Sequence, residues 1–183
     1  MNIYKRLEKI HGKCLFDMSD LNVNRIYYSI NIYKYRFLEN LPKKYIERFV
    51  LLVNEDNCDY LHKRFPQFEY LVCPNLGFIK LIPIVGRIFS LINHRKFINK
   101  SNCEVFFSAS NYDYNNILQL KLRKVIVIHD LKSIYERKGY WDDRLHKLKA
   151  RFYFKKLIKS SDIVIPISNY TKKDIERTFP RID

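Results

Sequence analysis

Short runs of apolar, β-branched and aromatic residues alternate along the chain with longer stretches of helical character. Runs of the first kind are typical of strands, and their alternation with helices is typical of parallel β-α-β construction. The expected strands are Cys14–Asp17, Arg48–Val53, Glu69–Val72, Glu104–Ser108, Val125–Ile128 and Ile163–Ile167. The expected helices cover residues 28–40, 56–65, 82–99, 142–159 and 170–178.

The strand patterns also indicate how the sheet is covered. Val125–Ile128 reads VIVI, so apolar side chains point to both faces of the sheet. Such strands belong to sheets that carry helices on each side. We therefore predict an α/β fold with a doubly wound, mostly parallel sheet and helices on both faces. Residues 1–12 are expected to form an N-terminal extension and residues 13–183 a single domain.

Polar residues follow directly after the predicted strands. Ligands of open parallel sheets bind beyond the carboxyl ends of the strands, because loop amides and helix N-termini converge there. The candidate site residues are therefore Ser19, Asp20, Asn54, Glu55, Ser110, Asn111, Tyr112, His129, Asp130, Ser168 and Asn169. Polar residues at strand ends also serve as helix caps and turn formers, and for Ser168 capping is the favoured interpretation.

His129 and Asp130 are the strongest candidates for chemistry. They follow the apolar run VIVI directly, and neither side chain favours a strand interior. A titratable pair held at the end of a rigid strand suits proton transfer or hydrogen bonding to a hydroxyl group. An ordinary turn at the end of the strand is the competing interpretation, because the dipeptide is short and common.

The charge balance favours negatively charged partners, but it does not identify which one. Lys and Arg number 34 against 19 Asp and Glu, which gives a formal net charge of +15. This excess attracts phosphate groups on nucleic acid, on anionic lipid or on a small ligand. The four cysteines are far apart and show no C-x-x-C spacing, so no metal site is predicted.

The chain shows no targeting or membrane-spanning pattern. Its first residues, MNIYKRLEKIHGK, lack the apolar core and cleavage site of a signal peptide. The longest apolar region, residues 76–92, is interrupted by Lys80, Pro83, Gly86 and Arg87. A bilayer span needs about 20 mostly apolar residues. A cytoplasmic protein is expected, with peripheral attachment to the inner face of the membrane as a further option.

Two segments resemble a known enzyme family. KVIVIHDLKSIY, residues 124–135, and RLHKLKARFYFKKLIKSSDIVIPISNYTKKDI, residues 144–175, resemble the amino-terminal half of family 4 glycosyltransferases of the GT-B fold. In that family a strand ending in His-Asp leads to a basic helix. A further strand, preceded by Ala-Asp or Ser-Asp, then runs into a serine and another helix. Here Ser161 and Asp162 precede that strand.

Towards the N-terminus the resemblance continues with fewer matching residues. SINIYKYRFLENL, residues 29–41, is similar to the segment that opens the family's first helix, which implies a substrate-binding role for Ser29, Ile30 and Asn31. Ser29 stands where the family usually has glycine. CEVFFSASNYDYN, residues 103–115, is similar to a family strand that ends in a histidine, and Phe107 takes that histidine's place. Ser110, Asn111 and Tyr112 are then expected to line the acceptor side.

The resemblance implies a Rossmann-like half of a retaining glycosyltransferase that moves a sugar from a nucleotide-sugar donor to a glycan or lipid-linked acceptor. His129 would bond a hydroxyl of the transferred sugar, and Asp130 would support the loop or the acceptor. No cofactor or metal is implied. The resemblance spans about Lys13 to Phe179, so the donor-binding domain is expected to be missing and the chain to be inactive without it.

Two other functions stay open. The net charge of +15 and the many Tyr and Phe residues fit a nucleic-acid-binding module, although no recognised nucleic-acid motif is present. A non-catalytic, membrane-associated remnant of the same fold is the second alternative. It rests on Arg144–Lys159, which contains seven Lys and Arg and no acid, and on Gly86–Lys100, which adds four more beside apolar residues. The simpler interpretation is that each helix buries its apolar stripe on the sheet and exposes its lysines to water.

Overall fold

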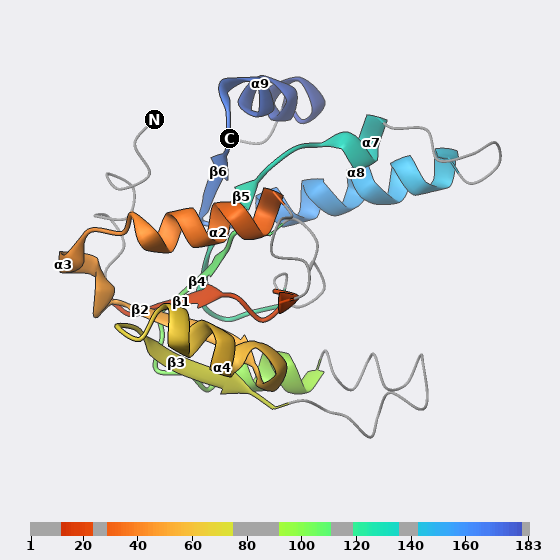
Figure 1. The fold of residues 1–183 in the computed structure, drawn as a ribbon. Helices are drawn as coiled ribbons and strands as arrows, with labels where there is room; N and C mark the ends of the chain where they lie inside the picture. The colour runs from red at the N-terminus through yellow and green to blue at the C-terminus, as the bar shows by residue number, and fades with distance from the viewer. Residues whose placement is uncertain (1–11, 24–28, 75–91, 111–118, 136–142, 181–183) are drawn as a thin grey trace.

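The chain adopts an α/β architecture in the computed structural model, which describes residues 12–23, 29–74, 92–110, 119–135 and 143–180 (Figure 1). The six described strands are β1 (Cys14–Asp17), β2 (Phe49–Asn54), β3 (Glu69–Cys73), β4 (Val105–Ser108), β5 (Arg123–Ile128) and β6 (Ile163–Pro166). They form one sheet in the order β3-β2-β1-β4-β5-β6. Every neighbouring pair is parallel.

This topology confirms the predicted fold class. The strand order runs outwards from β1 in one direction, and then from β4 in the other, as in a Rossmann-like doubly wound sheet. Each predicted strand matches an observed one, and β1 has the predicted bounds. β2 is shifted by one residue at both ends, and the other strands differ from the prediction by one or two residues at one end. The described sheet is parallel throughout, so the expectation of a mostly parallel sheet is met in full.

Helices connect these strands. They are α2 (Ser29–Glu39), α3 (Lys43–Ile46), α4 (Glu55–Arg64), α7 (Lys132–Tyr135), α8 (Asp143–Lys159) and α9 (Asn169–Thr178). Residues 92–99 are also helical. They form the described part of the predicted helix 82–99, whose beginning lies outside the described residues. The four-residue helices α3 and α7 were not predicted, because one turn is too short to show an apolar period.

Two apolar cores sandwich the sheet. On one face Phe16 and Phe107 pack with Phe37 of α2 and Leu61 of α4. Their chain neighbours point the other way, as alternate residues of a strand must. On that second face, Leu15 packs in a core with Ile98, Phe106, Phe154 and Leu157, a set that includes residues of 92–99 and α8. Because both faces are covered, the strands are apolar on both sides, which explains runs such as VIVI.

Candidate functional site

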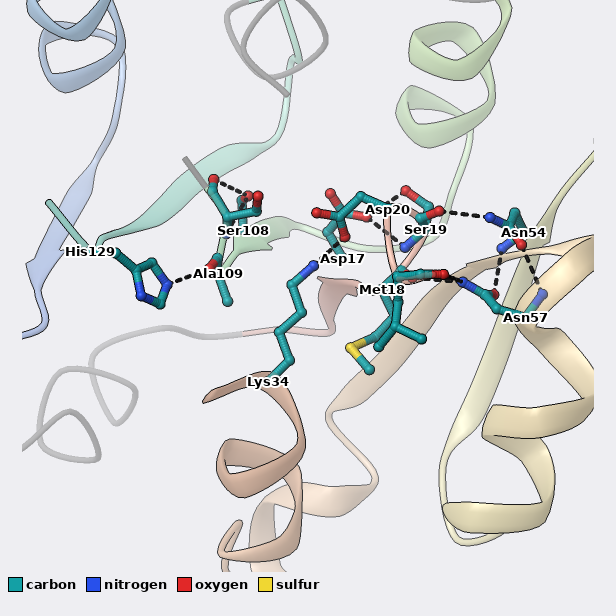
Figure 2. Close-up of polar contacts among 12 residues, drawn as sticks. Asp17, Met18, Ser19, Asp20, Lys34, Asn54, Asn57, Ser108, Ala109 and His129 are labelled. Atoms are coloured by element: carbon teal, nitrogen blue, oxygen red, sulfur yellow. Dashed lines mark hydrogen bonds and ion pairs between the residues drawn. The ribbon is translucent and has the colours of Figure 1, made fainter. Parts of the chain in front are cut away.

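Polar side chains gather at the carboxyl ends of four neighbouring strands. Figure 2 shows them as a row whose order follows the sheet: His129 after β5, Ser108 and Ala109 at β4, Asp17 at β1, and Asn54 at β2. Strand order reverses between β1 and β4, and this is the position at which open α/β sheets bind ligands. We call this row the carboxyl-edge cluster.

Asp17 is the buried acid of the carboxyl-edge cluster. It ends β1 and is only 2% exposed. Its Oδ1 accepts hydrogen bonds from the backbone N–H of Ser19 at 3.0 Å and from the Ser19 hydroxyl at 2.7 Å. Burial raises the pKa of Asp17, and the negative charge of Asp20 raises it further. The charge of Lys34 and the Ser19 hydroxyl lower that pKa and partly offset the burial.

Lys34 places an ammonium group inside the protein beside this acid. Its side chain is fully buried and forms an ion pair with Asp20, whose side chain is 33% exposed. In Figure 2 the amine points from α2 towards Asp17 and Asp20. A buried charge is costly unless it is paired and hydrogen-bonded. The two carboxylates therefore hold Lys34 in place, and Lys34 holds them together.

Two asparagines fix the loop that carries these acids. The Asn54 side chain donates to the Ser19 carbonyl at 2.7 Å. The buried Asn57 side chain donates to the carbonyls of Met18 at 2.9 Å and Leu21 at 3.1 Å. Asn54 and Asn57 also cap α4 reciprocally, each side chain accepting the other's backbone N–H. The start of α4 thus positions the backbone that follows β1.

His129 lies at the other end of the row, after β5. Its Nε2 is 2.8 Å from the Ala109 carbonyl, so Nε2 carries the proton and donates it. In the neutral ring the lone pair is then on Nδ1. The edge of the ring packs against Tyr33 of α2, with centroids 5.2 Å apart. Burial lowers the pKa of His129, against the raising effects of the Ala109 bond and of Asp130. The ring is therefore kept neutral.

Asp130 and Ser168 both organise turns at this edge. The Oδ1 of Asp130 accepts the backbone N–H of Lys132, at the start of α7, at 3.0 Å. The Ser168 hydroxyl accepts the backbone N–H of Thr171 at 3.0 Å and so caps α9, as the sequence favoured. The Thr171 hydroxyl in turn donates to the His129 carbonyl at 3.0 Å. The start of α9 is thereby tied to the end of β5.

The remaining predicted residues lie in different surroundings. Ser29, Ile30 and Asn31 form the first turn of α2, where Ser29 is exposed and Asn31 is only 8% exposed. Ser110 is buried beside Ser108, whose hydroxyl donates to the Ser110 carbonyl at 3.1 Å. Asn169 is the exposed first residue of α9. Asn111 and Tyr112 lie outside the described residues.

Sequence reasoning missed Asp17, Lys34 and Asn57. Asp17 looked like the last residue of a strand, and Asn57 like an ordinary residue of an acidic first turn. Lys34 did carry a signal. It stands four residues after Ile30 and three before Phe37, which is the spacing of residues on one helix face. A lysine in line with the apolar residues of a helix is a candidate buried charge.

No model of a known protein family matches the chain, and no curated protein matches it. Within the described ranges, no three or more His, Cys, Asp or Glu side chains come together as a metal site would require. The described helices include none with the length and apolar character needed to cross a bilayer. The chemistry of the carboxyl-edge cluster is therefore the main guide to function.

Replacing Lys34 tests the buried ion pair. Lys34→Met leaves Asp17 and Asp20 facing each other without the ammonium group. We expect the free energy of unfolding, measured in urea, to fall by roughly 2–4 kcal/mol. Breaking a fully buried ion pair costs about 3–5 kcal/mol, and the cost is smaller here because Asp20 is partly exposed. Adding Asp20→Asn should recover part of the loss. The control is Arg36→Met on the same helix, whose exposed ion pair should matter by less than about 1 kcal/mol. Equal losses for both variants would contradict the buried pair.

The lowered pKa of His129 predicts a pH-dependent stability. Below the ordinary value of 6.5, the unfolded chain takes up a proton that the folded protein resists. The free energy of unfolding should therefore rise with pH between the lowered pKa and 6.5, and it should fall as the solution is acidified. His129→Asn should flatten this part of the profile, measured by urea unfolding from about pH 5 to about pH 7.5. An unchanged slope in His129→Asn, or an equal change in the exposed control His62→Asn, would refute the assignment.

Proposed function

We propose that the chain is the acceptor-side half of a glycosyltransferase, which transfers a sugar from a nucleotide-sugar donor to a glycan or lipid-linked acceptor. In this proposal the carboxyl-edge cluster binds sugar hydroxyl groups. The proposal is supported by the doubly wound fold, by the resemblance of residues 124–135 and 144–175, and above all by the kind of side chains that meet where the strand order reverses.

The observation that carries the proposal is the acidic loop after β1. Rossmann-like sheets that bind dinucleotide phosphates use a glycine-rich turn here, so that backbone N–H groups and a helix N-terminus can approach the phosphate. In this chain the same turn reads Asp17-Met-Ser-Asp20 and contains no glycine. The Lys34 ammonium group offsets only one of the two acids, so the loop offers no positive charge to a phosphate, whereas the partly exposed Asp20 carboxylate can accept hydrogen bonds from hydroxyls. The position therefore favours a neutral ligand rich in hydroxyl groups.

His129 adds a second hydrogen-bonding group suited to a sugar. Because burial lowers its pKa, the ring is neutral near pH 7, and its Nε2 donates to the Ala109 carbonyl. A neutral imidazole can bond a hydroxyl without adding a cation to the site. Asp130 bonds the backbone of the following turn, which agrees with the supporting role that the resemblance implies for it.

Transfer also requires a group that stabilises the leaving diphosphate of the donor. In the proposed enzyme this charge is handled by a nucleotide-sugar-binding domain that faces the carboxyl edge, whether in the same polypeptide or in another chain. The acceptor side then holds the reacting hydroxyl close to the anomeric carbon, which contributes through proximity and orientation. The resemblance implies retention of anomeric configuration and no metal requirement.

Ligand binding by the chain alone tests this proposal. Saturation-transfer NMR with methyl and phenyl glycosides should show contact between the sugar and the protein, with weak affinity. His129→Ala should weaken binding by about tenfold, the loss expected for one hydrogen bond to a buried group. His62→Ala, which changes an exposed histidine of α4, should bind as the unaltered chain does. Inorganic pyrophosphate should not compete. Competition by pyrophosphate, or binding that is insensitive to His129, would contradict the proposal.

A further inference from the structure

Helix α8 carries a second apolar stripe on the side away from the sheet. Phe154, Leu157 and Ile158 are buried in the core. Leu145, Leu148 and Phe152 are 59%, 66% and 68% exposed. These three residues are spaced by three and four positions, so they lie along one line of the helix. At 3.6 residues per turn, that line falls opposite the buried stripe. Packing on the sheet therefore does not account for it.

Basic side chains border this exposed stripe on both sides. Lys155 and Lys159 lie on one side of Phe152, and Lys149 and Lys156 on the other, by their helical spacing. Arg144 is exposed near the helix N-terminus. None of these five bases takes part in the ion pairs found among the described residues. The outer face of α8 is thus apolar along its middle and positively charged along its borders.

We propose that the outer face of α8 binds the surface of an anionic lipid membrane. In this arrangement the helix lies in the plane of the interface, where Leu145, Leu148 and Phe152 enter the boundary between headgroups and acyl chains. The bordering lysines extend their ammonium groups to the lipid phosphates, while their methylene stems cover apolar surface. The net charge of +15 draws the whole chain towards such a surface.

The same features argue against two other occupants. A second copy of the chain would bring its own bases against these, because α8 contains seven Lys and Arg and one acid, Asp143, at its first position. Nucleic acid would satisfy the lysines, but it would leave two exposed leucines without a partner, because bases stack on aromatic rings rather than on leucine. A membrane surface satisfies both the apolar stripe and its basic borders.

This inference goes beyond the proposed sugar transfer and does not rest on it. The carboxyl-edge cluster and the outer face of α8 share no residue. A chain that fails to bind lipid could therefore still bind sugars, and a chain that fails to bind sugars could still bind lipid. If both are correct, α8 brings the chain to the membrane at which a lipid-linked acceptor is found.

Vesicle flotation of the full chain tests the proposal. The chain should float with vesicles of phosphatidylcholine containing about 30% phosphatidylglycerol, and much less with phosphatidylcholine alone. Leu148→Ser with Phe152→Ser should weaken partitioning by about tenfold or more, since it removes two large apolar side chains from the interface. Lys155→Gln, Lys156→Gln and Lys159→Gln together should have a similar effect, as should high salt.

Matched controls change residues of the same kind elsewhere. Ile32→Ser with Val72→Ser replaces two apolar side chains that are 44% and 39% exposed on α2 and β3. Lys43→Gln, Lys63→Gln and Lys173→Gln together remove three exposed bases from other helices. Both controls should float as the unaltered chain does. Circular dichroism and urea midpoints should show that all four variants fold, since the substituted side chains are exposed.

Three results would overturn the proposal. The first is the absence of binding to anionic vesicles. The second is equal loss of flotation in the α8 variants and in the controls, because attraction would then be a property of the net charge alone. The third is a chain that does not bind vesicles but forms a dimer or binds oligonucleotides, where the α8 variants abolish the dimer or the oligonucleotide binding. That result would assign the face to a second copy or to nucleic acid.

Discussion

A parallel sheet that is buried on both faces can present polar chemistry only at its ends, and this constraint shapes the protein. Residues such as Leu15 and Phe16 send their side chains into opposite cores, which leaves no face of β1 for a ligand. At the carboxyl end, where the strand order reverses, the chain instead places Asp17, Asp20 and the buried ammonium group of Lys34. The buried ammonium group of Lys34 thus holds Asp20, whose side chain is partly exposed at this end of the sheet.

The composition of the carboxyl-edge cluster decides which ligands suit it. Phosphate-binding sheets of this class present backbone N–H groups on glycine. This chain presents the partly exposed carboxylate of Asp20 on a loop that Asn54 and Asn57 hold in place, and a neutral imidazole at His129. Rigid acceptors of this kind favour hydroxyl groups, because the cost of ordering them has been met during folding. The proposed acceptor-side role is supported by this preference and by the resemblance of residues 124–135 and 144–175.

Most of the fold was predictable from the sequence, because strands buried on both faces leave a strong apolar signal. The site was predictable in part. His129 directly follows β5 and Ser168 lies two residues after the end of β6, so the structure places both at the carboxyl edge. Lys34 was not predicted, because a lysine inside a helix normally indicates a solvent-exposed face. Only the packing of α2 against the loop after β1, which brings together two residues 14 positions apart, makes it a buried partner of Asp20. The exposed stripe of α8 was hidden for a similar reason, since apolar residues alone do not reveal which side faces the sheet.

Hydroxyl recognition at the carboxyl edge is tested most directly by an amide NMR titration of the chain with a methyl glycoside. The largest shifts should fall on Ser19, Ser110 and His129, which follow β1, β4 and β5 at the carboxyl edge of the sheet. Shifts confined to other parts of the molecule, with these three signals unmoved at saturation, would contradict it.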